Sequence, residues 1–245
     1  MYPRTLCTMT HHYDSSLCAV AMRPICCRYL FHRRLTSTRA LALAGLSVVY
    51  VDVLSGLLHI TLDNPTITHW PLLGPECEAF QGHHVAPNDI TRGTWLRHLC
   101  EAHFVNAILC ISVLVNRKSA TLRQFMIFAN VSSTWMMAAH RLAHTHPRDM
   151  WWWAKTLHST GLLISPAHHS AHHITYTTNF AIFTGWCNPF LNFAVEYIGH
   201  PHNPLWVISF FLCMLAPTAL SFGRERIPQY KPSWDGVKVA EGKQG

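Results

Sequence analysis

The chain has 245 residues, of which 49% are hydrophobic and only 13% are charged. Soluble proteins carry about 25% charged residues, so this composition favours a membrane-associated protein. The net charge of +7 lies mostly at the two ends of the chain, and the neutral apolar body between them argues against a nucleic-acid-binding protein.

The N-terminal segment, residues 1–38, is rich in Arg, Ser, Thr and Cys and contains a single acid, Asp14. Two interpretations stay open for it: an organellar transit peptide, or a disordered basic tail that contacts lipid headgroups. Residues 39–222 are expected to form one membrane domain, and residues 223–245 a polar C-terminal tail.

Four apolar segments follow one another in the body of the chain, at residues 40–60, 103–116, 122–139 and 205–222. A helix that crosses a bilayer needs about 20 apolar residues, and the first segment meets that length. The pattern predicts an all-α integral membrane bundle of three to four transmembrane helices. The nine cysteines form no CxxC pair, which indicates reduced thiols rather than disulfides or a cysteine-based zinc site.

Histidine is unusually frequent, with 19 residues, and its spacing is regular. Residues four apart lie on the same face of a helix, so His59 and Asp63, and likewise His140 and His144, can point at one metal ion. The run from 168 to 173 offers two such pairs side by side. The candidate metal ligands are His59, Asp63, His83, His84, His140, His144, His168, His169, His172 and His173.

These ligands suit a metal centre that caps the bundle. Imidazole nitrogen with some carboxylate oxygen suits iron, zinc or copper, and ten ligands suffice for two ions with open positions. Asp52 lies seven residues before His59, on the same helical face. It is a candidate to accept the second ring N–H of a ligand histidine; an interfacial acid at a helix end is the alternative.

Four stretches of the chain resemble a known family in their order and spacing. They are residues 52–64, the run Glu-Ala-Phe-Gln-Gly-His-His at 78–84, His-Arg-Leu-Ala-His at 140–144, and Ser-Pro-Ala-His-His-Ser-Ala-His-His at 165–173, which is followed by residues 179–188. The chain thereby resembles the membrane lipid desaturases that include plasmanylethanolamine desaturase, which makes plasmalogens, and the plastid palmitate trans-3 desaturase.

The resemblance implies a non-haem centre of two iron ions that uses O2 and two external electrons to place a double bond in an acyl or alkyl chain. The implied partners are a phospholipid or acyl lipid, the membrane, and cytochrome b5 or a ferredoxin as electron donor. The implied location is the endoplasmic reticulum or a plastid membrane. Arg92 is a candidate to bind a lipid phosphate, and Phe183 and Trp186 are candidates to line an acyl tunnel. An interfacial position is the alternative for all three residues.

Two other functions share these sequence features. A membrane di-iron lipid hydroxylase uses the same metal chemistry, and ligand spacing does not separate it from a desaturase. A histidine-rich metal transporter belongs to a different class, and it would place its polar ligands near the middle of the membrane. Here the histidines stand at the ends of apolar segments and in the connections between them, which favours a catalytic cap.

Overall fold

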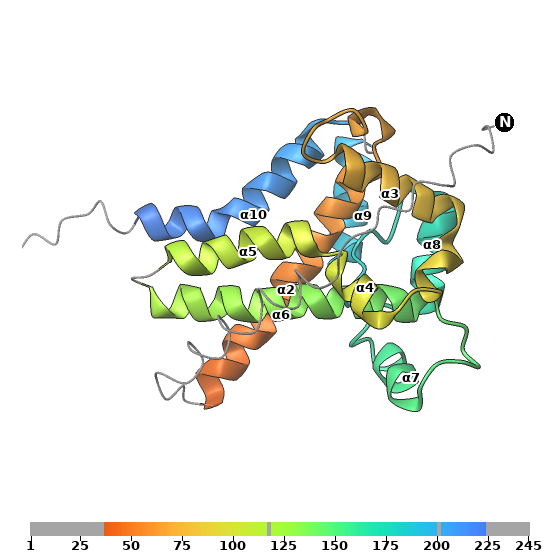
Figure 1. Ribbon diagram of the computed structural model, residues 1–245, viewed down its shortest axis with the longest axis horizontal. Helices are drawn as coiled ribbons and strands as arrows, with labels where there is room; N and C mark the ends of the chain where they lie inside the picture. Colours follow the sequence, from red (N-terminus) through yellow and green to blue (C-terminus); the bar gives the residue numbers. More distant parts are fainter. Residues whose placement is uncertain (1–36, 117–118, 200–201, 224–245) are drawn as a thin grey trace, which may run out of the picture.

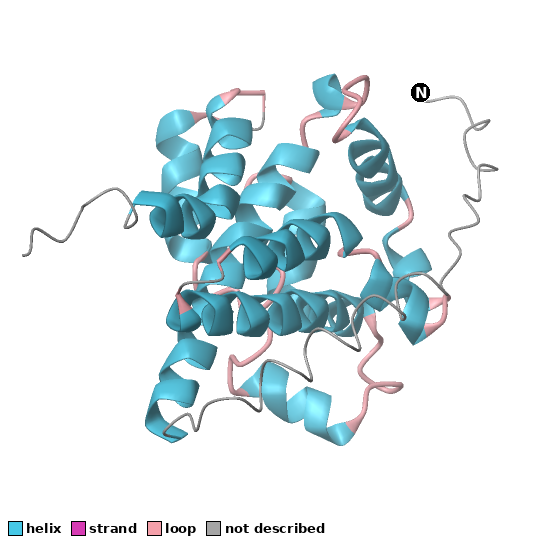
Figure 2. Cartoon of the chain, turned by 60° about the vertical axis from the view of Figure 1, so that its left-hand side comes forward, coloured by secondary structure: helices cyan, strands magenta, loops and turns pink. Residues whose placement is uncertain are grey.

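The computed structural model describes residues 37–116, 119–199 and 202–223, and within these ranges every regular element is a helix (Figures 1 and 2). The predicted all-α fold is therefore confirmed. The predicted N-terminal segment and C-terminal tail fall almost wholly outside these residues. In chain order the elements are α2 (Ser37–Leu62), η1 (Pro65–Ile67), α3 (Gly74–Val85), η2 (Pro87–Thr91), α4 (Trp95–Cys100), α5 (His103–Val115), α6 (Ala120–His144), α7 (Trp152–Ser159), α8 (Pro166–Thr175), α9 (Asn188–Ile198) and α10 (Leu205–Gly223).

Four long helices form the body of the fold. Figure 1 shows α5, α6 and α10 running side by side, with α2 crossing them at a steep angle. Their apolar residues make one continuous core. Short hydroxyl contacts cross between helices at two places, from Ser47 to Ser132 (3.1 Å) and from Ser112 to Thr218 (2.7 Å). Such small polar residues allow close helix packing where the surroundings are apolar.

Among the described residues, one helix is long and apolar enough to cross a membrane, the segment Thr38–Leu62 of α2. The predicted segments in α5 and α10 form apolar helices, but these are shorter. The prediction of three to four spanning helices is therefore not confirmed. Large apolar side chains are nevertheless exposed along these helices, including Leu41 and Leu46 on α2 and Leu212 and Leu220 on α10.

The shorter helices gather at one end of the bundle, where α3, α4 and α8 surround the C-terminal part of α6 (Figure 1). Local sequence explains where they begin. Ser165 caps α8 by accepting a hydrogen bond from the His168 amide, and Pro166 occupies the first turn. Thr94 caps α4 in the same way. Serine, threonine and proline favour these positions because the first helical N–H groups need acceptors. This end of the bundle carries the histidines.

Two glycines on the histidine-bearing helices are expected to respond oppositely to replacement by alanine, one losing and the other gaining stability. A Cβ at Gly56 in α2 would clash with a methyl of Leu191 and lie 3.3 Å from the Ala181 amide nitrogen, whereas a Cβ at Gly82 in α3 would meet nothing within 4 Å. We expect Gly56→Ala to lower the free energy of unfolding by about 1–3 kcal/mol through overpacking. Gly82→Ala should raise it by about 0.5–1 kcal/mol, because alanine favours the helix.

Thermal unfolding of the two metal-free variants in detergent tests both the expected loss of stability in Gly56→Ala and the expected gain in Gly82→Ala. A Gly56→Ala protein as stable as the wild type would mean that α2 has room to move away from the segment that contains Ala181.

Candidate metal centre

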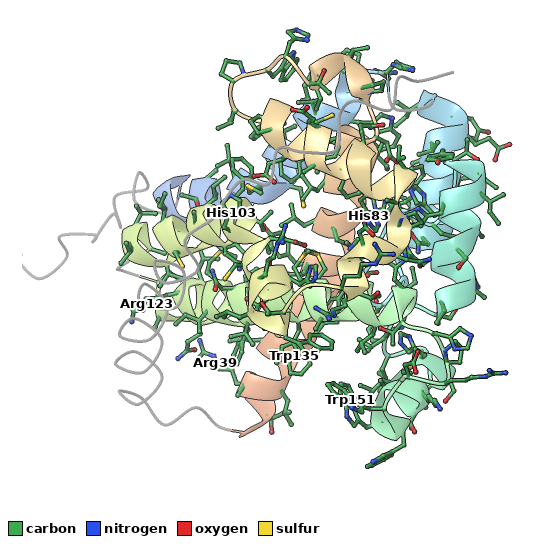
Figure 3. The ribbon with its side chains drawn as sticks, turned by 45° about the vertical axis from the view of Figure 1, so that its right-hand side comes forward. Arg39, His83, His103, Arg123, Trp135 and Trp151 are labelled. Carbon is green, nitrogen blue, oxygen red and sulfur yellow. The ribbon has the colours of Figure 1, made fainter. Side chains whose placement is uncertain are left out.

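Nine of the ten predicted ligands converge into two groups at the capped end of the bundle. Within each group the ligand atoms lie within 4.8 Å of one another. Figure 3 labels His83, around which nitrogen atoms of neighbouring side chains gather. The five-histidine group consists of His83, His140, His144, His169 and His173, and the mixed group of His59, Asp63, His84 and His172.

Helix geometry explains how neighbouring histidines serve different groups. His83 and His84 are adjacent on α3 and enter one group each, because successive residues of a helix point about 100° apart. On α8, His169 and His173 lie four residues apart and share the five-histidine group, whereas His172 enters the mixed group. Helices α3 and α8 therefore each contribute to both groups, which holds the two groups next to each other.

His168 is the predicted ligand that the structure leaves outside both groups. Its side chain is exposed, and its backbone carbonyl accepts a hydrogen bond from the Asn179 side chain at 3.2 Å. The prediction paired His168 with His172 on one face of α8. The structure pairs only His169 with His173, and His168 points to the surface.

The buried ring nitrogens of the two groups fit metal ions. Both ring nitrogens of His59 and of His140 are buried without a hydrogen-bond partner, as is the Nε2 atom of His83. Buried polar atoms are otherwise almost always paired. The Nε2 atom of His169 lies 2.7 Å from that of His144 and 3.1 Å from that of His173. Rings whose lone pairs converge in this way form a donor set suited to a cation.

The electrostatics keep these imidazoles neutral. Burial, with a smaller contribution from neighbouring imidazoles, lowers the pKa of His83, His84 and His144 to about 3. Burial raises the pKa of Asp63 to about 8, although its Oδ1 lies 3.2 Å from His84 Nε2. A neutral imidazole has a free lone pair, so each ring is ready to bind a metal at neutral pH, and a bound cation would favour the Asp63 carboxylate.

Groups around the ligands orient and enclose them. His172 Nδ1 lies 2.8 Å from the Thr178 carbonyl, an arrangement that places the ring proton on Nδ1 and directs Nε2 towards Asp63. The Phe80 ring packs edge-on against His59 with centroids 4.5 Å apart. Phe180 packs against His172 at 5.2 Å. Phe80 and Phe180 lie within stretches that carry the family resemblance, but the sequence predicts no role for either of them, and Thr178 lies just outside those stretches.

Asp52 has a different role from the one predicted. Its side chain is fully buried in the middle of α2. Oδ1 accepts hydrogen bonds from the amides of Thr184 and Gly185, at 2.8 and 3.0 Å, and Oδ2 from the amide of Cys187 at 3.0 Å. The carboxylate therefore fastens the loop before α9 to α2, and its hydrogen bonds go to backbone amides rather than to an imidazole. It is not an interfacial acid at a helix end either.

The three predicted substrate contacts lie outside both ligand groups. Arg92 is exposed and pairs with Asp89 at 3.0 Å. Phe183 is buried in the apolar core. Trp186 is half exposed, and its ring N–H donates to the Gly161 carbonyl at 2.7 Å. Their roles towards a lipid stay predictions.

Fold and site together define a helical protein with a candidate two-metal centre held mainly by histidines. The chain belongs to the lipid desaturase family, because residues 48–196 match the family's lipid desaturase domain. The predicted family is thus confirmed.

Two plant proteins illustrate the similarity. The chain is 29% identical over 153 residues to "Fatty acid desaturase 4, chloroplastic" of Arabidopsis thaliana, a match that covers 60% of this chain and 46% of that protein. It is 26% identical over 148 residues to "Fatty acid desaturase 4-like 1, chloroplastic" of the same plant, covering 59% and 49%. The matched region thus spans about half the length of these relatives. No solved structure matches the chain.

Proposed function

We propose that this protein is a membrane-bound di-iron lipid desaturase, which uses O2 and two external electrons to introduce a double bond into an acyl or alkyl chain of a phospholipid. The observation that carries the proposal is the convergence of nine ligands from α3, α6, α8 and the C-terminal end of α2 into two adjacent groups. Membership of the lipid desaturase family supports it independently.

The two groups would hold one iron ion each. Bound iron would supply the O2-dependent oxidising power that removal of hydrogen from an unactivated CH2–CH2 unit needs, and that no side-chain acid or base provides. The overall reaction balances when O2, two electrons and two protons convert the saturated chain into the alkene and two waters. The protein's own contribution is to hold the neutral imidazoles in place, orient His172 through Thr178, and surround His59 and His172 with phenylalanine rings.

The position of the centre favours an enzyme at a membrane surface over a transporter. His59 lies in the last turn of α2, the helix that qualifies as a membrane span. His140 and His144 lie in the last turns of α6. A transporter is expected to place its ligands near the middle of the membrane. Ligands at the end of the bundle would instead meet a lipid chain near the surface.

We further propose a plastid membrane as the location, with a ferredoxin as electron donor. The support is that both plant relatives are named as chloroplastic proteins. The endoplasmic reticulum, with cytochrome b5 as donor, is the alternative. Fractionation of cells that express the tagged chain distinguishes the two locations.

Lipid profiling tests the desaturase assignment. We expect cells that express the wild type to gain one unsaturated lipid species, and cells that express His172→Ala to lack it at equal protein level. His69→Ala, a change at an exposed histidine outside the ligand groups, should behave as the wild type. A hydroxylated lipid would indicate a hydroxylase instead. Purified wild-type protein that contains only zinc would contradict an iron enzyme.

A further inference from the structure

The turn that follows α8 contains an unusual backbone conformation. Tyr176 has φ 58° and ψ 9°, in the left-handed region. Side chains clash with the backbone there, and glycine usually occupies this position after a helix. Asn179 in the same turn has φ 59°, but asparagine tolerates the left-handed region. A bulky tyrosine in this conformation is a true outlier, and strained residues of this kind cluster at functional sites.

The Tyr176 side chain reaches the mixed ligand group. Its ring stacks on the His84 imidazole with centroids 4.9 Å apart and planes at 30°. The same ring meets His172 edge-on at 6.2 Å. The His84 side chain is only 5% exposed, whereas Tyr176 is 41% exposed. The tyrosine ring therefore lies on the outer side of the ligand and covers it.

The backbone of the same turn holds the other ligand. The Tyr176 amide donates to the His172 carbonyl at 2.7 Å, and the Thr178 carbonyl lies 2.8 Å from His172 Nδ1. Residues 176–178 thus contact two of the four members of the mixed group, one through a side chain and one through the backbone.

We propose that Tyr176 is a positioning residue, whose ring fixes the plane of the His84 imidazole so that Nε2 stays beside Asp63 Oδ1, 3.2 Å away. The inference rests on the proposed metal centre. A tyrosine stands where glycine would suit the backbone better, and its ring restrains His84 from the exposed side. Tyr176 acts through His84 and needs no contact with the substrate.

Three substitutions at this position separate the effect of the ring on metal binding from the effect of the backbone strain on stability. Tyr176→Gly relieves the strain and removes the ring, Tyr176→Asn removes the ring in a residue that tolerates the left-handed region, and Tyr176→Phe keeps the ring. Tyr197→Ala is the matched control, because Tyr197 is 78% exposed and its ring contacts Phe193 rather than a ligand.

The measurements use the whole 245-residue chain in detergent. The first is the thermal midpoint Tm of the metal-free form. The second is the Co²⁺ affinity, and the third is the ligand-field absorption spectrum of the Co²⁺-bound form. We expect Tyr176→Gly to raise the metal-free Tm by roughly 2–4 °C. It should weaken Co²⁺ binding by about 10-fold or more, as changes next to ligands do, and alter the spectrum. Tyr176→Asn should weaken binding similarly, and Tyr176→Phe and Tyr197→Ala should match the wild type.

Wild-type affinity and spectrum in both ring-free variants would overturn the inference. The inference would also be overturned by a Tyr176→Phe protein that loses as much Co²⁺ affinity as the glycine variant. The phenol oxygen, rather than the ring, would then support metal binding. A wild-type protein that binds neither Co²⁺ nor Fe²⁺ would contradict the proposed function itself, and the inference would fall with it.

Discussion

His169→Ala is expected to abolish lipid desaturation and to reduce the metal content of the protein, whereas His168→Ala should leave both unchanged. The two histidines are neighbours on α8, and both belong to the same sequence run. His169 is 1% exposed and belongs to the five-histidine group. His168 is exposed and belongs to neither group. Because the two variants alter adjacent histidines, only one of which belongs to a ligand group, their comparison tests whether the ligand groups bind the metal.

The size of the effect follows from what His169 contacts. Its Nε2 atom lies 2.7 Å from that of His144 and 3.1 Å from that of His173, so alanine would remove a ligand from the centre of the group. Loss of a residue that merely supports a ligand costs roughly 10–100-fold in affinity or activity. Loss of a ligand should cost at least as much, and the activity of His169→Ala should fall to background.

Metal analysis of the purified variants, together with lipid profiles of the cells that express them, checks this expectation. The wild type should hold two ions, one for each ligand group, and His168→Ala should hold the same number. Full activity in His169→Ala would remove the five-histidine group from the mechanism. A His168→Ala protein with lost metal would show that the exposed ring turns inward when metal is bound.

The sequence predicted most of the ligands because helical spacing is a local property. Once 168–173 is helical, the angles of its histidines around the axis of α8 can be worked out. Relative to His169, the ring of His173 lies at about +40° and that of His172 at about −60°. His168 lies at about −100°, beyond the arc that the other three histidines span. What periodicity alone does not give is which side of α8 faces the other helices, because α3 and α6 set that rotation through packing.

Asp52 shows a second limit of reasoning from helical faces. Seven residues bring Asp52 back to the face of His59, but they also separate the two along the axis by about 10 Å. That distance excludes a direct hydrogen bond to the imidazole. The partners of Asp52 come from residues 184–187, over 130 positions away in the chain, and no local pattern indicates them.

The prediction of three to four spanning helices was not confirmed, for a related reason. Composition showed an apolar body, but it did not show how the apolar surface is divided between lipid and the protein interior. In the Thr38–Leu62 segment of α2, 44% of the most apolar window is buried inside the protein. Helix α6, which was expected to contain a span, buries polar residues such as Asn130 and Ser133. Much of its sequence therefore serves helix packing.

Asp52→Ala is expected to cause a large loss of stability. The substitution leaves the amides of Thr184, Gly185 and Cys187 without their acceptor, in a site where the carboxylate is fully buried. A buried donor without a partner costs about 1–3 kcal/mol, so the free energy of unfolding should fall by at least about 3 kcal/mol. For a domain of this size the midpoint should drop by roughly 6–12 °C.

Thermal unfolding of the metal-free protein in detergent measures this effect, with two further variants for comparison. Asp52→Asn keeps one carbonyl oxygen but turns an N–H group towards one of the three amides, so its stability should fall between those of the alanine variant and the wild type. Asp149→Ala removes an exposed carboxylate and should change stability by less than about 0.5 kcal/mol. An Asp52→Ala midpoint equal to that of the wild type would mean that water or another group replaces the carboxylate. The loop before α9 would then not depend on Asp52 for its position.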